Sequence, residues 1–152
     1  MIYPALLRAA AFGVAVSATG LAARQCGSIS DIGPGGIPLQ PPKWVFPVVW
    51  TCLYATTGAA WAMGGPRADV VMFAITLLCC WWLCCYVCLR LKTLAAVSLI
   101  ATTALAFATA ACLQGAAGLF LAPLAVWLAF ASYLNAYEVA RPGSETTDGG
   151  RV

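Results

Sequence analysis

The chain has 152 residues, of which 62% are hydrophobic and only 9% are charged, and its formal net charge is +3. A soluble domain carries about 25% charged residues, so this chain has too few charged side chains to form a water-exposed surface. Its high apolar content also excludes a disordered or collagen-like protein. The small net charge and the scattered Lys and Arg residues argue against nucleic-acid binding, and the absence of histidine removes the commonest general base and metal ligand.

Five apolar runs follow one another along the chain, each close to the about 20 residues that cross a bilayer core. The runs predict helices at residues 4–23, 44–63, 70–89, 94–113 and 119–139. Alternation of apolar and polar residues with a period of two is absent, which disfavours a transmembrane β-barrel. We therefore expect an all-α membrane protein, a bundle of five transmembrane helices in one domain of residues 1–140, followed by a polar tail at residues 141–152.

The first run, residues 4–23, has two interpretations. Arg8, the apolar stretch and the small residues Ala22 and Ala23 are typical of a signal peptide with a cleavage site. However, Arg8 lies inside the run rather than before it, and the apolar length approaches a full span. A first transmembrane helix is therefore favoured, with a signal peptide as the alternative.

The connections between the runs predict the orientation of the bundle. The first connection, residues 24–43, is long and rich in Gly and Pro, whereas the later breaks are short. One side of the membrane would carry Arg24, Lys43, Arg90, Lys92, Arg141 and Arg151, and the other would carry Arg67 and, at most, Arg8. Because cytoplasmic loops are enriched in Lys and Arg, we expect the first loop and the C-terminus to be cytoplasmic, in a bacterial envelope membrane or, in a eukaryote, in the mitochondrial outer membrane or an endomembrane.

Two predicted helices carry bulky aromatic side chains along one face. In the second helix this face comprises Trp50, Tyr54, Thr57 and Trp61, and in the fifth it comprises Pro123, Trp127, Phe130, Ala131, Leu134 and Glu138. Trp50 and Trp127 lie deeper than the interface where membrane tryptophans gather. A deep indole N–H needs a hydrogen-bond partner or a polar ligand, so a ligand pocket and ordinary helix packing explain these tryptophans equally well.

The third predicted helix is rich in cysteine. Five of the eight cysteines of the chain lie in this one apolar run, namely Cys79, Cys80, Cys84, Cys85 and Cys88. Disulfide frameworks are spread through polar, turn-rich sequence, so we interpret all five as small apolar packing residues. A metal site is disfavoured because it needs thiolates that converge from more than one backbone segment.

Glu138 is the only acidic residue of the fifth predicted helix. A carboxylate inside a membrane is by default a functional candidate. Because Glu138 lies near the predicted cytoplasmic end, where a side chain reaches the headgroups and water, a simple end-of-helix charge is the favoured interpretation.

Two segments resemble the TspO/MBR family, the tryptophan-rich sensory proteins known in animals as translocator protein or peripheral-type benzodiazepine receptor. Residues 41–54, read as Pro-Pro-Lys-Trp-Val-Phe-Pro-Val-Val-Trp-Thr-Cys-Leu-Tyr, resemble the family signature. Residues 122–135 are similar to its fifth-helix motif of Pro, then Trp, then Phe-Ala-x-Tyr-Leu-Asn. The resemblance implies a five-helix bundle whose internal pocket opens toward the first loop.

The resemblance also implies ligands and site residues. Family members bind porphyrins, animal members also bind cholesterol and benzodiazepine-type drugs, and some bacterial members degrade protoporphyrin in light with two tryptophans that correspond to Trp50 and Trp127. We expect the ligand to contact Trp44, Pro47, Trp50, Tyr54, Trp82, Trp127, Phe130, Ala131, Leu134 and Asn135. Leu134, Tyr137 and Arg141 fit a proposed sterol pattern that matches many membrane helices by chance. The chain departs from the family at Cys79, where an Asn is usual, and at Ser98, where an acidic residue is common.

The expected function is therefore binding of a porphyrin, another tetrapyrrole, a sterol or a similar flat lipophile within the helix bundle, in transport or as a receptor for sensing. Lys43 or Arg24 would pair with porphyrin propionates. No cofactor is required, and the small-residue helix faces are compatible with a homodimer. One alternative is a light- or oxidant-dependent enzyme that degrades protoporphyrin through Trp50 and Trp127, and another is a scaffold protein without a small ligand. Hydrolase or transferase chemistry has no supporting motif.

Overall fold

The structure is a computed structural model that describes residues 2–27, 38–113 and 115–140. Five long helices account for most of these residues: α1 (Ile2–Ala23), α2 (Val45–Gly64), α3 (Asp69–Leu83), α4 (Lys92–Cys112) and α5 (Ala116–Val139). A 3₁₀ turn, η2 (Gly65–Arg67), follows α2, and a π-helical segment, η3 (Cys84–Cys88), extends α3. Five helical segments are long and apolar enough to cross a membrane, which confirms the predicted fold class.

The helix bounds agree closely with those expected from the sequence. When η3 is counted as the end of the third helix, the largest difference is at the start of α5, which begins at Ala116 rather than at residue 119. The last turn of the third predicted helix is present, but it is π-helical, with the Leu89 amide bonded to the Cys84 carbonyl at 3.0 Å. α1 packs in the bundle through the fully buried Phe12 and Val16.

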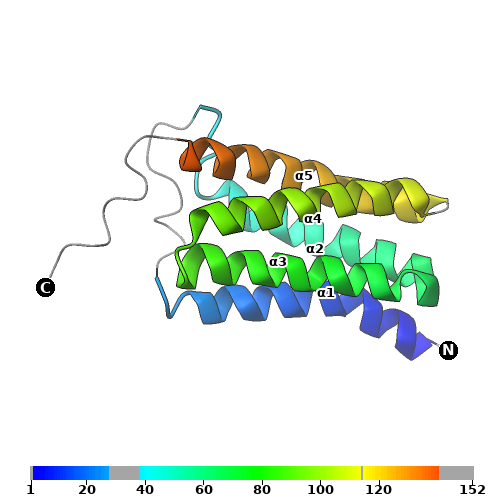
Figure 1. The fold of residues 1–152 in the computed structure, drawn as a ribbon. Coiled ribbons are helices and arrows are strands. Elements are labelled where there is room, and N and C mark those ends of the chain that lie inside the picture. The colour runs from blue at the N-terminus through cyan, green and yellow to red at the C-terminus, as the bar shows by residue number, and fades with distance from the viewer. Residues whose placement is uncertain (1, 28–37, 114, 141–152) are drawn as a thin grey trace, which may run out of the picture.

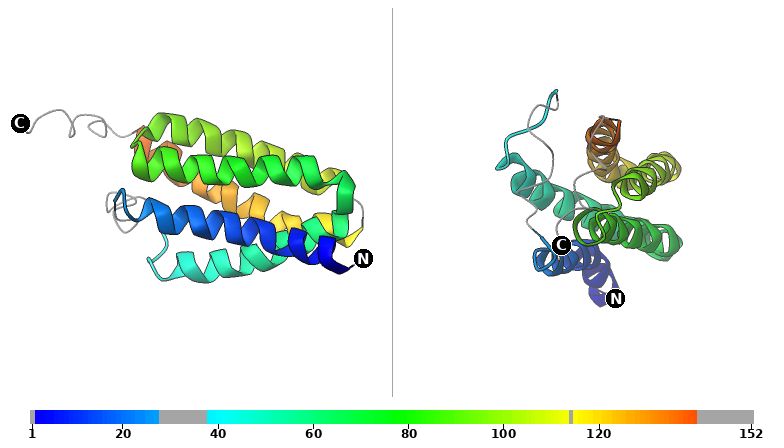
Figure 2. Two further views of the ribbon diagram at one scale, coloured as in Figure 1. Left: turned by 90° about the horizontal axis from the view of Figure 1, so that it is seen from below. Right: turned by 60° about the vertical axis from the view of Figure 1, so that its left-hand side comes forward.

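The five helices form a closed ring in the order α1, α2, α5, α4, α3, and α3 returns to α1 (Figures 1 and 2). Large side chains from every helix fill the middle of this ring, among them Phe12, Leu53, Met72, Leu99 and Leu124. Because lipid is as apolar as these side chains, tight packing rather than hydrophobic burial has to hold the ring together. The ring order places α2 beside α5, the two helices that carry the aromatic faces.

Two glycines allow neighbouring helices to approach closely. A Cβ on Gly58 of α2 would lie 2.0 Å from the carbonyl oxygen of Ala9 on α1. A Cβ on Gly118 of α5 would lie 2.3 Å from the carbonyl oxygen of Ala110 on α4. Both obstacles are backbone atoms, which cannot move without the helix itself, so each pair of helices depends on the glycine.

We expect Gly58→Ala to destabilise the bundle by about 1–3 kcal/mol, the usual cost of inserting a methyl group into packed structure. The α1–α2 crossing would have to widen. The measurement is the thermal unfolding midpoint in detergent. Gly20→Ala is the matched control, because a Cβ there meets nothing within 4 Å. Equal midpoints for the two variants would contradict the close α1–α2 contact.

The end of the bundle that holds the N-terminus of α1 contains a partly exposed ion pair. Arg8 donates two hydrogen bonds to Asp69, at 2.6 and 2.8 Å, and the Trp61 indole N–H donates to the same carboxylate at 2.8 Å. The pair explains how an arginine is tolerated within the apolar run of α1, because a paired charge costs much less in a membrane than an isolated one. It joins α1 to α3 and to the end of α2.

Candidate functional site

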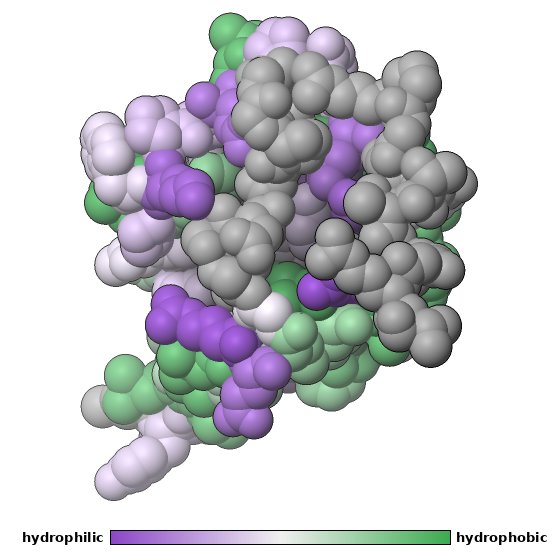
Figure 3. All heavy atoms as spheres, turned by 90° about the vertical axis from the view of Figure 1, so that its left-hand side faces the viewer, coloured by the Kyte–Doolittle hydropathy of each residue, from purple (hydrophilic) through white to green (hydrophobic). Residues whose placement is uncertain are grey.

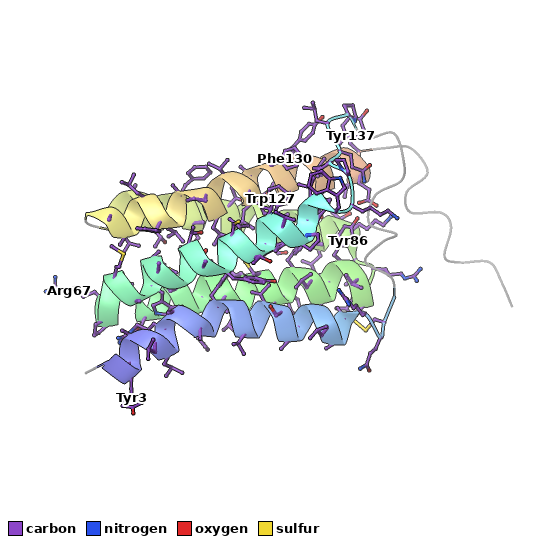
Figure 4. All side chains as sticks on the ribbon, turned by 180° about the vertical axis from the view of Figure 1, so that it is seen from behind. Tyr3, Arg67, Tyr86, Trp127, Phe130 and Tyr137 are labelled. Carbon is purple, nitrogen blue, oxygen red and sulfur yellow. A yellow bond between two sulfur atoms is a disulfide. The ribbon has the colours of Figure 1, made fainter. Side chains whose placement is uncertain are left out.

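The predicted ligand-binding residues lie toward the end of the bundle opposite to that ion pair. This end, the basic end, holds the last residues of α1, η3 and α5 and the first residues of α2 and α4, and it carries Arg24, Lys43, Arg90 and Lys92. Hydrophilic side chains gather on it in Figure 3, which views the molecule from this side. In Figure 4, Trp127, Phe130, Tyr86 and Tyr137 lie toward this end, far from Tyr3 and Arg67.

An aromatic cluster joins α2 and α5. The Phe46 ring meets the Trp127 ring edge-on, with centroids 5.8 Å apart, and Trp127 lies 5.6 Å from Phe130. On the same face of α2, one turn beyond Phe46, the Trp50 ring lies 5.8 Å from that of Tyr54. We call Phe46, Trp50, Tyr54, Trp127 and Phe130 the α2–α5 aromatic cluster. Its rings are partly buried and lie at the separations at which aromatic groups attract one another.

The six tryptophans of the chain differ in their exposure and in whether the indole N–H donates a hydrogen bond. Trp44 and Trp81 are exposed, at 68% and 47%. Trp61 donates to Asp69, and Trp82 donates to the side-chain oxygen of Asn135 at 3.3 Å. Within the described part of the chain, Trp50 and Trp127 are the partly buried tryptophans whose indole N–H has no hydrogen-bond acceptor. The two indole N–H groups singled out by their depth in the predicted helices therefore have no acceptor among the described residues.

A second polar group on the same face of α2 also lacks a partner. Thr57 is fully buried, and its hydroxyl makes no hydrogen bond to any described residue. Other buried threonines satisfy this group on their own helix, as Thr76 does by donating to the Met72 carbonyl at 2.7 Å. A buried unpaired hydroxyl is uncommon and calls for a physical explanation, and a polar atom of a bound ligand would supply one.

The remaining predicted ligand residues have different surroundings. Trp44 and Pro47 are exposed at the start of α2, whereas Leu134 and Asn135 are buried and Ala131 is partly buried on α5. Asn135 also donates to the Ala131 carbonyl at 3.1 Å, so both ends of its amide are engaged within the bundle. In the sterol pattern, Leu134 is buried, Tyr137 is partly exposed and Arg141 lies outside the described residues.

Glu138 belongs to a buried polar network, and the interpretation of it as a charge that reaches water was wrong. Its side chain is only 4% exposed, it accepts a hydrogen bond from the Tyr86 hydroxyl, and it pairs with the Lys92 ammonium at 2.9 Å. The network joins η3, α4 and α5. One feature of the sequence indicated this burial. Glu138 lies on the same face of α5 as Trp127 and Leu134, and that face points into the bundle.

The interpretation of the five cysteines of the third predicted helix as packing residues was wrong for Cys88, which forms a disulfide with Cys26 (yellow bond in Figure 4). Cys79 and Cys85 are buried and unpaired, as expected of packing residues. The pairing was missed because Cys26 is 62 residues away in the sequence and lies just after α1. Among the described residues, no group of three or more acidic residues and cysteines gathers to hold a metal.

Comparison with known proteins agrees with this arrangement. The sequence pattern of the TspO/MBR family matches residues 34–140, which include α2 to α5 and the whole α2–α5 aromatic cluster. This chain belongs to the TspO/MBR family. It is also similar to the tryptophan-rich protein TspO of Chlorobaculum tepidum, with 34% identity over 111 residues that cover 63% of this chain and 68% of the relative. It is therefore a multi-pass membrane protein of that family.

Proposed function

We propose that this TspO/MBR protein binds a flat, lipophilic aromatic ligand of the porphyrin type at the α2–α5 aromatic cluster. The observation that carries the proposal is the unused indole N–H of both Trp50 and Trp127, which are partly buried on facing helices. Indole rings offer a large stacking surface and a polar donor on one side chain. A porphyrin offers the matching features, namely an extended π-face and polar nitrogen and carboxylate groups.

The surroundings of the cluster support this ligand class. The buried Thr57 hydroxyl adds a polar group on the same face of α2. Arg24 and Lys43 are exposed at the basic end, where they would pair with carboxylates of a porphyrin whose ring lies deeper. We further propose that the basic end faces the cytoplasm, because it carries Arg24, Lys43, Arg90 and Lys92, whereas the opposite end carries Arg8 and Arg67.

Titration of the purified full-length protein with protoporphyrin IX in detergent tests the proposal. We expect saturable binding with a shift of the porphyrin absorption band and quenching of tryptophan fluorescence. Empty detergent micelles are the control for partitioning. A linear response equal to that of the micelles would contradict ligand binding and favour the scaffold alternative. Illumination of the complex separates the two remaining functions, since light-driven loss of the porphyrin band favours the degrading enzyme over a binding protein.

A further inference from the structure

The Cys26–Cys88 disulfide ties the end of α1 to the end of η3 at the basic end. The two Cα atoms are 5.0 Å apart. Just beside it lies a second buried cluster formed by Ala23 of α1, Cys85, Tyr86 and Val87 of η3, and Ala95 of α4, against which Cys88 packs. Tyr86 of this cluster also holds the buried Glu138. The disulfide therefore fixes α1 against the network that joins η3, α4 and α5.

The position of this disulfide is unusual for a structural bond. Cys26 is exposed and Cys88 is only partly buried. In the proposed orientation the basic end faces the cytoplasm, where thiols are kept reduced and where disulfides are as a rule transient and redox-sensing. Exposed disulfides are also the ones that exchange readily with the glutathione pool.

We propose that Cys26 and Cys88 form a reversible redox-modification site that exchanges with low-molecular-weight thiols and disulfides on the cytoplasmic side. This inference rests on the proposed orientation and does not depend on the ligand. In the oxidising direction, the thiolate of one cysteine attacks a small disulfide and releases one small thiol. The second cysteine then displaces the other small thiol from the mixed disulfide. Two protein thiols are thereby oxidised, and one small disulfide is reduced to two thiols.

Opening the bond changes the attachment of α1. In the dithiol form, Ala23 and its contacts with η3 hold the last turn of α1, without the covalent constraint that a disulfide places on the chain. The last turn of α1 would then open more often and expose Tyr86 and its neighbours. The redox state of the cytoplasm would thus determine how often the last turn of α1 separates from η3 at the basic end.

The first test equilibrates the full-length protein in detergent with buffers that range from oxidised to reduced glutathione, followed by alkylation of free thiols and mass spectrometry. We expect the Cys26–Cys88 bond to open and re-form reversibly within this range, with a thermal midpoint about 5 °C or more lower in the reduced form. Amide hydrogen exchange at the end of α1 should rise severalfold on reduction. A bond that stays closed in fully reduced glutathione, in folded protein, overturns the proposal.

The second test traps thiols in living cells. We expect Cys26 and Cys88 to be alkylated in unstressed cells and to be protected after brief treatment with a thiol oxidant such as diamide. Cys26→Ser and Cys88→Ser should each abolish the intramolecular Cys26–Cys88 bond, detected by peptide mass spectrometry without reduction, and leave the remaining cysteine protected only as a mixed disulfide with a small thiol. Cys84→Ser, one turn earlier on the same segment, should keep both the bond and the protection. A pair that is fully disulfide-bonded in unstressed cells would be a permanent structural link, and protection lost in Cys84→Ser would indicate a different pairing; either outcome overturns the proposal.

Discussion

Replacing Trp50 or Trp127 with Ala should weaken protoporphyrin IX binding at least tenfold, which corresponds to about 1.4 kcal/mol. A stacked aromatic contact contributes about 0.5–1.5 kcal/mol beyond area burial, and truncation also loses apolar contact area at about 25 cal/mol per Å². The indole N–H of each side chain, unused within the described part of the protein, adds a possible polar contact with the ligand. Fluorescence and absorption titrations of the purified variants measure the effect.

The matched control is Trp81→Ala, because Trp81 is 47% exposed on α3 and lies outside the aromatic cluster. This variant should bind protoporphyrin as wild type does. Trp61 and Trp82 are poorer controls, since their N–H groups bond Asp69 and Asn135 and their loss would disturb the fold. If Trp50→Ala and Trp127→Ala, properly folded, both bind as tightly as wild type, the site assignment is wrong.

Phe substitutions at the same positions separate binding from chemistry. Trp127→Phe keeps an aromatic ring for stacking but removes the N–H and the easily oxidised indole, so affinity should fall only modestly. If the wild type degrades protoporphyrin in light and Trp127→Phe binds but does not degrade it, the enzymatic alternative is favoured. If the wild type causes no light-driven loss, the binding function stands alone.

Replacing Glu138 with Leu should lower the free energy of unfolding by about 2–3 kcal/mol. Breaking a fully buried ion pair costs about 3–5 kcal/mol because an uncompensated charge is left behind. The cost is smaller here because the Lys92 side chain is 35% exposed and can turn toward water. The Tyr86 hydroxyl would also lose its acceptor. The thermal midpoint in detergent should fall by several degrees.

The control variant also replaces Lys92 and Tyr86, the two partners of Glu138. The triple variant Glu138→Leu, Lys92→Met and Tyr86→Phe removes all three polar groups of the network, and apolar replacement of a whole buried network is often neutral or stabilising. Its midpoint should return close to that of wild type. A triple variant as unstable as Glu138→Leu alone would mean that the network is not the reason for the loss.

The fold and the aromatic faces of α2 and α5 were largely predictable because their signals are local in the sequence. Each transmembrane helix satisfies its own backbone hydrogen bonds and needs only a run of about 20 apolar residues. The five spans followed from that rule, and the structure changes their bounds by a few residues. The spacing of Trp50 and Tyr54 on one helix, and of Trp127 and Phe130 on another, likewise defines a face before any partner is known.

The sequence by itself therefore determined the membrane class, the five spans, the family and the helix faces that carry Trp50 and Trp127. The tertiary structure decided what those residues meet: the ring order that sets α2 beside α5, the burial of Glu138, and the Cys26–Cys88 bond. It also decided that Arg8 pairs with Asp69. The Trp61 and Trp82 N–H groups donate to Asp69 and Asn135, whereas those of Trp50 and Trp127 have no acceptor among the described residues. The physical reason is distance along the chain. Whether a polar side chain is paired depends on atoms of other helices that pack beside it. A local pattern of apolar residues does not predict which atoms those are.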